Sequence, residues 1–481
     1  MTSQFDQGFF VRTPSAITQA GTSAPVGRYN DLLIAVPVAV GIVIAMALGS
    51  SQMTTLVTVT ALGTALVAPH VGLAILAYMA PLVPPSIIPA PGFDSALVAA
   101  ILLGCLYRLP IDRPQLRIGL SVGLMIAFVL YVTVQQLPEL STGYGNAADH
   151  AVGYLYLQLL TGFGAILAAI WVLRGRSPFP VLAMAIAGAV TAALIALVVY
   201  FVPASAGALV NVSGVTLDPA RAVGTFSNPN FMGGMAAVSM TAATSLMAGA
   251  KSRRIRGLLL ACAVILGGAV IVTLSRGALI TAIAGLVAVG LTQSRRTAIM
   301  VVVVGLVGVF IIYPAFVNWR LTNILGSASA AAVQVTAQSD LGRLTGALAG
   351  VSLFLSSPLV GVGFGHFFAT AVQIPGVSNS AHNWYTYVLG EQGVVGALLF
   401  VSVLASLAPR LRSLPSRPRS LGVSVLAAFA TACLFLEVPT SFQTFAIPAI
   451  CIVASLVGQW PLAPDRDAED GAPMLSRLAT E

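Results

Sequence analysis

The stretch SNSAHNWYTYVLGEQG, from 378 to 393, places a histidine, an asparagine and a carboxylate at the start of a long apolar run. His382 titrates near neutral pH, so it can take a proton from an attacking hydroxyl group. Asn383 follows it directly, and Glu391 lies about two turns into the predicted helix, where it can orient a neighbour or close a salt bridge. A lone histidine before a helix is also a common structural hydrogen-bonding group, and the sequence leaves both roles open.

Three arginines in other motifs carry the charge that would bind an anion. Arg221 opens RAVGTFSNPN, Arg276 lies in TLSRGALIT, and Arg343 lies in SDLGRLTG. Arginine donates paired, charge-assisted hydrogen bonds to phosphate oxygens. Each also has a simpler explanation. Arg221 can contact lipid headgroups, Arg276 can anchor the chain at the membrane interface, and Arg343 can pair with Asp340.

The local patterns around these arginines predict two helix starts. Asn-Pro marks a turn into a helix that Ser227 or Asn228 would cap, and Asn230 lies in the same turn as a supporting residue. The segment 339–358 has a capping signal and an apolar face at helical spacing, which predicts an amphipathic helix lying on the membrane surface. Arg343 would lie in its first turn, where the helix dipole disfavours a cation. That position therefore favours a functional role.

Aromatic residues surround the histidine, and the loop before it is rich in glycine. Trp384, Tyr385 and Tyr387 suit the faces of sugars, and they are equally typical of an interfacial belt. The glycines of PLVGVGFGHFF superficially match a dinucleotide loop, but they do not lie in a strand–turn–helix unit. We expect them to form a flexible turn that folds the loop back over a cavity.

Composition decides which elements position these residues. Hydrophobic residues make up 57% of the 481 residues and charged residues 8%, with a mean hydropathy of +0.94. Soluble proteins carry about 25% charged residues. Stretches of roughly 17–25 apolar residues recur, each long enough to cross a bilayer as a helix, without the alternation of barrel strands. The sequence predicts an all-α, polytopic membrane protein with about 12–14 transmembrane helices.

Lysine and arginine indicate the side of each loop, because they are enriched in short cytoplasmic loops. If the N-terminus is inside and the spans alternate, 19 of the 23 basic residues fall on the inner side. The outer exceptions are Arg320 and the three arginines described above. The predicted order is a flexible cytoplasmic tail (1–30), transmembrane helices (31–317), an outer loop (318–383), transmembrane helices (384–460, the first covering 384–408) and a second cytoplasmic tail (461–481).

Several other kinds of site are not indicated. The four cysteines are scattered in apolar runs without CxxC spacing, which argues against a metal site or a disulfide. We predict neither a cofactor nor a metal ion. The net charge of +8 fits cytoplasmic loops that face anionic lipid, and no basic–aromatic stripe indicates nucleic acid.

The motifs and their order resemble those of the bacterial O-antigen ligase and O-antigen polymerase superfamily, which are polyprenyl diphosphate-dependent membrane glycosyltransferases. They comprise an arginine ahead of FSNPN, SRGAL at a hairpin, DLGR and PLVGVGFGHF in a large outer loop, and HNWYTYVLGEQGVVG. The resemblance covers about residues 180–460. It implies a GT-C-like fold without a nucleotide-sugar site or a required metal ion.

The resemblance also implies a reaction and its partners. A glycan would move from a polyprenyl diphosphate carrier to the hydroxyl of a glycan, lipid or protein acceptor, with inversion, at the outer face of the bacterial cytoplasmic membrane. Arg221, Arg276 and Arg343 would bind the diphosphate, and His382 would be the base. A polymerase that extends carrier-linked units fits the same motifs. A transporter of the lipid-linked glycan fits less well, because carboxylates at mid-membrane and repeated broken helices are not evident.

Overall fold

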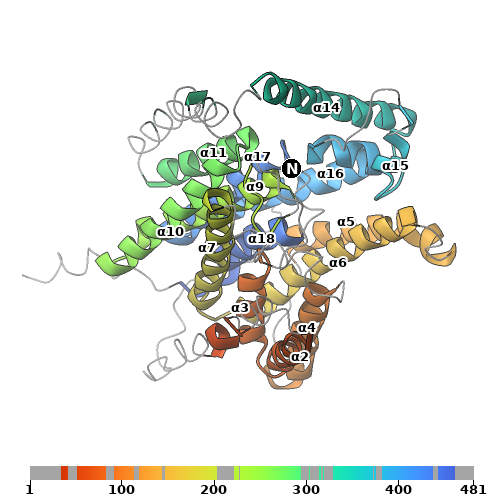
Figure 1. The fold of residues 1–481 in the computed structure, drawn as a ribbon. Coiled ribbons are helices and arrows are strands. Elements are labelled where there is room, and N and C mark those ends of the chain that lie inside the picture. The colour runs from red at the N-terminus through yellow and green to blue at the C-terminus, as the bar shows by residue number, and fades with distance from the viewer. Residues whose placement is uncertain are drawn as a thin grey trace, which may run out of the picture.

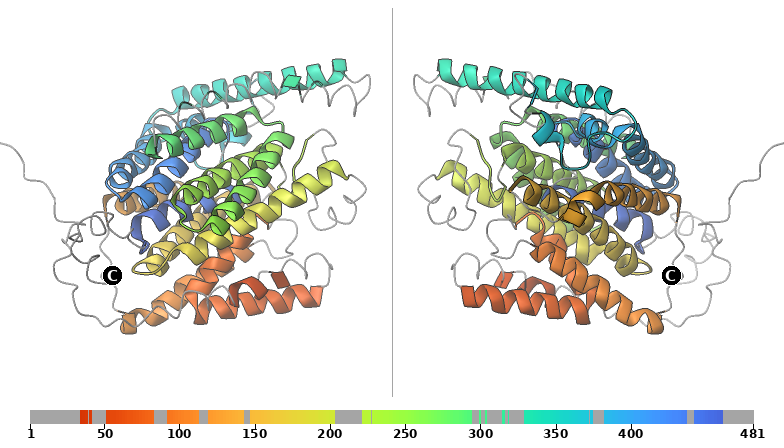
Figure 2. Two further views of the ribbon diagram at one scale, coloured as in Figure 1. Left: turned by 90° about the vertical axis from the view of Figure 1, so that its left-hand side faces the viewer. Right: turned by 90° about the vertical axis from the view of Figure 1, so that its right-hand side faces the viewer.

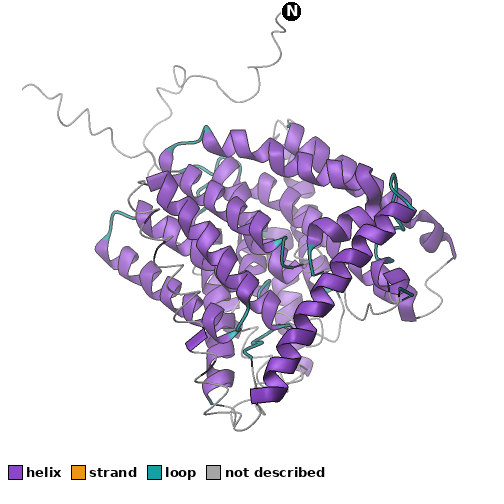
Figure 3. Cartoon of the chain, turned by 90° about the horizontal axis from the view of Figure 1, so that it is seen from above, coloured by secondary structure: helices purple, strands orange, loops and turns teal. Residues whose placement is uncertain are grey.

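The structure is a computed structural model that is all-α over the residues it describes (Figure 3). These are 34–38, 40–41, 51–82, 92–112, 119–142, 147–202, 221–226, 228–293, 329–371, 373–374, 382–436 and 442–460, with a few single residues between 294 and 328. The predicted tails, most of a predicted span at 297–317, and Ser227 lie outside them. The described helices (Figure 1) are α2 (Ser51–Val67), α3 (Pro69–Met79), α4 (Phe93–Asp112), α5 (Leu120–Thr142), α6 (Ala147–Leu173), α7 (Phe179–Phe201), α9 (Pro229–Gly249), α10 (Arg253–Val272), α11 (Arg276–Gln293), α14 (Ser329–Ser356), α15 (Phe367–Ala371), α16 (Trp384–Arg412), α17 (Ser416–Ala432) and α18 (Phe442–Val457).

The predicted all-α, polytopic membrane protein is confirmed. Within the described residues, seven helices of 18 to 29 residues are long and apolar enough to cross a membrane. They belong to α5, α6, α7, α9, α10, α11 and α16. Helices dominate because hydrocarbon offers no hydrogen-bond partners, so the backbone must satisfy its own polar groups.

Small residues let these helices pack closely. A methyl group added at Gly285 of α11 would lie 2.1 Å from Thr241 Oγ1 of α9, and one at Gly188 of α7 would lie 2.1 Å from the carbonyl oxygen of Tyr78 in α3. Close backbone approach through small residues is the usual way in which helices associate in lipid. In this way α9 packs against α7, α10, α11 and α17. Most of the residues along α9 are therefore buried inside the bundle.

The bundle has two functionally different ends. At one of them α10 and α17 finish and α9, α11 and α16 begin; we call it the site end. At the other, α9 finishes at Gly249, α10 begins with Arg253 and Arg254, and α16 ends at Arg412; we call it the basic end. The long helix α14 lies along one edge of the bundle, and α2 lies along the opposite edge (Figure 2).

Helix α14 corrects the sequence-based view of Arg343. It begins at Ser329, ten residues before the capping signal that we expected to start it. Arg343 therefore lies in the middle of the helix, and the argument from a cation in the first turn does not hold. A large apolar stripe is exposed along α14, comprising Leu341, Leu344, Leu348, Val351 and Leu355.

Helix α16 is broken, whereas the sequence predicted one continuous span over 384–408. Gly393 adopts φ 63° and ψ −164°, and it divides the helix in two. The rings of Trp384 and Phe400 lie 5.9 Å apart between centroids, although sixteen residues of straight helix would separate them by about 24 Å. The first part of α16 thus folds back on the second and carries its N-terminus toward α17.

Candidate active site

Three helix beginnings converge on one turn, formed by residues 433–436 after α17. The backbone N–H of Trp384, the first residue of α16, donates a 2.8 Å hydrogen bond to the carbonyl oxygen of Cys433. In α11, a methyl group added at Gly277 would lie 2.6 Å from Phe435 Cβ, and in α9 one at Gly234 would lie 2.5 Å from Leu436. The amide ends of α9, α11 and α16 therefore face the same region, and helix N-termini of this kind favour anions.

Arg221 and Asn230 form one side of this region. Arg221 is half-buried; its Nε donates to the carbonyl oxygen of Thr273 at 2.9 Å, and its Nη2 donates to Asn230 Oδ1 at 2.8 Å. Asn228 caps α9, because its Oδ1 accepts a 2.8 Å bond from the backbone N–H of Asn230. The predicted capped turn is confirmed for Asn228. Arg221 ties this turn to the hairpin that precedes α11.

That hairpin presents Arg276 at the first position of α11. Ser275 Oγ accepts a hydrogen bond from the backbone N–H of Ala278 at 3.3 Å, so it caps the helix. Leu274 adopts a left-handed conformation with φ 52°, which turns the chain sharply. The Arg276 side chain is exposed. Each residue of the TLSRG motif thus contributes to the turn or to the charge at its tip.

His382 stands two residues before Trp384, which bonds to the 433–436 turn, and Arg343 belongs to the surroundings of the histidine. The imidazole is half-buried, and burial is the main reason that its pKa lies below the ordinary 6.5, with the positive charge of Arg343 as the second cause. The structure thus brings together Arg343 and His382, which are distant in sequence. A lowered pKa keeps the ring neutral at pH 7, the form that can accept a proton.

His382 is also conformationally strained. Its φ is 46°, and among the described residues only Leu274 shares a positive φ without being glycine. A left-handed conformation costs an ordinary residue about 1–2 kcal/mol. Strained residues of this kind cluster at functional sites. Both residues lie within a motif that contains a candidate site residue.

Asn383 has a structural role. Its Oδ1 accepts hydrogen bonds from the backbone N–H groups of Tyr385 and Thr386, at 3.0 and 3.3 Å, so it is the N-cap of α16. This anchors the chain directly after His382.

Replacing Asn383 with alanine is therefore expected to lower the free energy of unfolding by about 0.5–2 kcal/mol, because the cap is lost. Asn383→Ser keeps a capping oxygen and should retain most of the stability and activity. Thermal unfolding of both purified variants in one detergent measures the difference. If Asn383→Ser is as stable as wild type but has lost as much transfer activity as Asn383→Ala, the asparagine side chain has a role in the reaction instead.

Glu391 also has a structural role. It is fully buried, and its Oε1 accepts a 2.8 Å hydrogen bond from the backbone N–H of Phe367. It therefore holds the segment that precedes α16, which the sequence places in an outer loop. Neighbouring backbone groups make similar bonds: Val362 N–H to the Gly390 carbonyl at 3.1 Å, and Gly363 N–H to the Glu391 carbonyl at 2.8 Å.

The glycine-rich segment is thus fixed by hydrogen bonds to α16, whereas we expected a flexible turn. Pro358 and Leu359 accept bonds from Val394 and Val395, so residues 358–363 pair with both sides of the helix break. Gly361, Gly363 and Gly365 all have positive φ. At Gly361 a methyl group would lie 2.2 Å from the backbone of Glu391. The glycines therefore allow close backbone pairing.

Two of the three aromatic residues beside His382 are packed in the core and are not available to a sugar. Trp384 is fully buried and Tyr387 is 5% exposed. The Tyr387 ring stacks between the other two, with its centroid 5.4 Å from that of Trp384 and 5.0 Å from that of Phe367. This corrects the expectation of sugar-facing or interfacial rings for these two. Tyr385 is half-buried, and its hydroxyl donates to the carbonyl oxygen of Ala430 at 3.0 Å. These rings thus support the chain around His382 from the protein core.

Sequence reasoning missed three residues of α5 that hold the loop. Tyr131 donates to the carbonyl oxygen of Gln392 at 2.9 Å, Gln135 to that of Val360 at 2.6 Å, and Gln136 to that of Phe364 at 2.8 Å. The available signal was the pair Gln-Gln inside an otherwise apolar run. Polar groups in such a run need internal partners.

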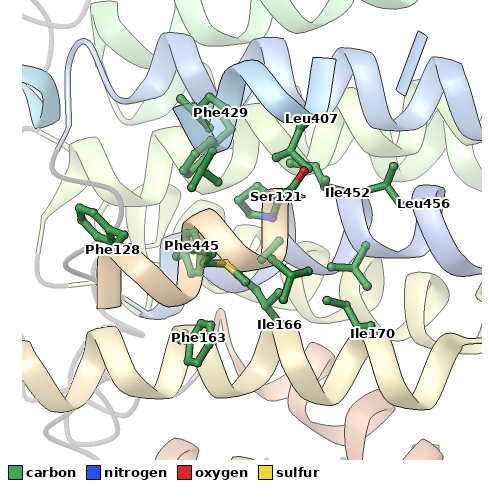
Figure 4. A pocket seen from close by; sticks show the side chains of 18 of the residues that line it. Ser121, Phe128, Phe163, Ile166, Ile170, Leu407, Phe429, Phe445, Ile452 and Leu456 are labelled. Carbon is green, nitrogen blue, oxygen red and sulfur yellow. The ribbon is translucent and has the colours of Figure 1, made fainter. Parts of the chain in front are cut away.

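A cavity of about 1000 Å³ lies beneath the site, between α5, α6, α16, α17 and α18 (Figure 4). Apolar side chains such as Phe128, Ile166 and Ile452 point into it. Trp384 lines it at the site end. Arg174 and Arg410 line it toward the basic end. No group of three histidine, cysteine or acidic side chains that could hold a metal ion occurs in the described part of the chain.

Comparison with known families covers the later motifs of the site and begins after Arg221 and Asn230. Residues 261–401 match the family model described as O-antigen ligase (Wzy_C). The matched segment includes Arg276, Arg343, His382 and Glu391. No curated protein matches the chain. The match confirms the resemblance to the O-antigen ligase and polymerase superfamily over this segment, and together with the seven apolar helices it supports a multi-pass bacterial membrane protein.

Proposed function

We propose that this chain, with its O-antigen ligase domain, transfers a glycan from a polyprenyl diphosphate carrier to an acceptor hydroxyl at the outer face of the bacterial cytoplasmic membrane. The observation that carries the proposal is the convergence of three helix N-termini on the turn 433–436, with Arg276 at the start of one of these helices and the strained His382 directly before another. The site end would face outward, and both chain termini would be cytoplasmic.

The arginines would stabilise the leaving group. As the bond between the anomeric carbon and the diphosphate oxygen breaks, negative charge develops on the diphosphate, and charge-assisted hydrogen bonds strengthen with it. Arg276 is exposed at the tip of its hairpin, and Arg343 acts near His382. Arg221 is already bonded to Asn230 and Thr273, so it would both support the turn and add positive charge.

His382 would take the proton of the acceptor hydroxyl while the acceptor oxygen bonds to the anomeric carbon. The carrier would leave as polyprenyl diphosphate, and attack opposite the leaving group would invert the anomeric centre. No metal ion or cofactor takes part in this scheme. A GT-C-like arrangement is part of the same proposal.

The direct test supplies purified protein with a polyprenyl diphosphate-linked oligosaccharide, without added metal or nucleotide. Products are followed by mass spectrometry, with and without hydroxyl-bearing glycan, lipid and protein acceptors. Product that requires a foreign acceptor supports a ligase, and longer carrier-linked glycan supports the alternative, a polymerase of the same fold. Absence of transfer with every acceptor, together with movement of the carrier across liposomes, would reject the proposal in favour of a transporter.

The pH dependence of transfer provides a second test. The base must be neutral, and burial together with Arg343 lowers the pKa of His382, so the acidic limb of the wild-type rate profile should have its midpoint below 6.5. Arg343→Met removes a nearby positive charge. Its removal stabilises the protonated form of the His382 ring and therefore raises the pKa of His382. The acidic limb of the variant should therefore move to higher pH. If the acidic limb of the rate profile has the same midpoint in Arg343→Met as in wild type, Arg343 does not influence the protonation of His382.

A further inference from the structure

We propose that the basic end of the cavity binds an anionic phospholipid of the cytoplasmic leaflet. In this arrangement the guanidinium groups of Arg174 and Arg410 hold the headgroup phosphate, and an acyl chain extends into the apolar space between α5, α6, α16 and α18. This site is distinct from the proposed catalytic region, which lies at the other end of the bundle. It does not depend on the proposed reaction, although its assignment to the cytoplasmic leaflet rests on the orientation proposed above.

The charge and the wall of the cavity carry this assignment. Arg174 follows α6 and Arg410 lies in the last turn of α16, and both line an otherwise largely apolar cavity of about 1000 Å³. Gly119 leaves room for the arginine: a methyl group there would lie 2.7 Å from Arg410 Nη1. The hydroxyl groups of Ser121 and Ser413 line the same end. Cationic and hydroxyl groups at the mouth of an apolar slot match a phosphate that carries a hydrocarbon chain.

The length of the slot agrees with one leaflet. The lining runs along α16 from Phe400 to Arg410 and along α5 from Gly119 to Val129. Ten residues of helix cover about 15 Å, which is half of a hydrocarbon core of about 30 Å. An acyl chain whose phosphate sits at Arg174 and Arg410 would therefore reach Phe128 and Phe400, and the Phe400 ring lies 5.9 Å from that of Trp384.

A polyprenyl tail is the competing occupant, and the arginines argue against it. A carrier whose diphosphate binds at the site end would bring only hydrocarbon to Arg174 and Arg410. Hydrocarbon makes no use of the two positive charges at this mouth, whereas a headgroup phosphate accepts charge-assisted hydrogen bonds from arginine. A phospholipid from the basic end accounts for both the apolar wall and the charged mouth.

Native mass spectrometry of the purified full-length protein tests the site, with phosphatidylglycerol and phosphatidylcholine of identical acyl chains. Wild type should retain phosphatidylglycerol preferentially. Arg174→Gln/Arg410→Gln should lose about fivefold in affinity for each charge removed. The matched control is Arg176→Gln/Arg412→Gln, which removes the same charge from exposed positions at the same end that do not line the cavity. The control should bind like wild type.

A second variant addresses the apolar part of the slot and keeps both arginines. Ala449→Phe fills space between α18 and α6 and should reduce phosphatidylglycerol binding without changing net charge. Equal retention of the two lipids by wild type would overturn the proposal. Equal losses of phosphatidylglycerol affinity in the two double variants would also overturn it, because they would indicate an effect of general surface charge. Displacement of phosphatidylglycerol by polyprenyl phosphate, in wild type and equally in Arg174→Gln/Arg410→Gln, would assign the cavity to the carrier instead.

Discussion

Replacing His382 with asparagine is expected to slow glycan transfer by about 10²–10⁴-fold, the usual contribution of a general base. Asparagine is the informative replacement because His382 holds a left-handed conformation with φ 46°. Asparagine tolerates that conformation better than most residues, and it can still hydrogen-bond. Its amide cannot take a proton from a hydroxyl group at neutral pH. The loss should therefore appear in kcat, with donor binding and thermal unfolding close to those of wild type.

His366→Asn is the matched control for this experiment. His366 is the other half-buried histidine of the described outer-loop residues, and its Nδ1 lies 3.1 Å from the carbonyl oxygen of Phe364. The same substitution there should change the transfer rate by only a few-fold. If His382→Asn keeps a transfer rate within about threefold of wild type while its pH profile is unchanged, the proton is removed by another group, and the histidine is a structural element of the turn.

The charged residues of the candidate site stand out in the sequence because they depart from the positive-inside rule. Arginines at the outer side of membrane spans are disfavoured, so Arg221, Arg276 and Arg343 each needed a reason to be there. Motif order then related them to His382. The structure adds the coupling between Arg343 and His382, which are separated by a long loop, and the bond from Arg221 to Asn230.

The sequence did not predict how the loop and α16 support the site, because that information lies in backbone pairing. Residues 358–363 fill the break at Gly393, and no local pattern indicates that two such distant segments exchange hydrogen bonds. The apolar run after Trp384 correctly predicted a helix. Such a run has the same composition whether the helix is straight or folded back, so it could not predict the break. A glycine inside the run was a weak signal, since glycine also occurs in straight membrane helices.

Burial was the other property that the sequence could not assign. Trp384 and Tyr387 stand beside the candidate base, and aromatic rings at a membrane boundary are typical of both sugar contacts and interfacial belts. Neither description fits rings that stack in a core with Phe367. Their positions follow from the break in α16, which turns that face of the helix inward. Their roles therefore depend on the same glycine.

Gly393→Ala is expected to have the largest effect on folding, and through folding on the site. A conformation with φ 63° and ψ −164° is essentially restricted to glycine, and forcing another residue into it costs about 1–3 kcal/mol. The new methyl group would also lie 2.4 Å from the carbonyl carbon and oxygen of Leu359, which belong to the paired segment. Relief requires the helix to straighten or the segment 358–363 to leave, and either change withdraws His382 from the turn 433–436. We expect a lower midpoint of thermal unfolding and loss of most transfer activity.

Gly257→Ala controls for the chemical change itself. Gly257 lies in α10, is exposed, and has no atom within 4 Å of an added methyl group. Alanine there should be neutral or should stabilise the helix by up to about 1 kcal/mol, because it is the better helix former. The comparison is made on both purified variants in one detergent, by thermal unfolding and by transfer rate. A Gly393→Ala protein with wild-type stability and activity would mean that α16 functions as a continuous helix, and that the fold-back of its first part is not needed to position His382.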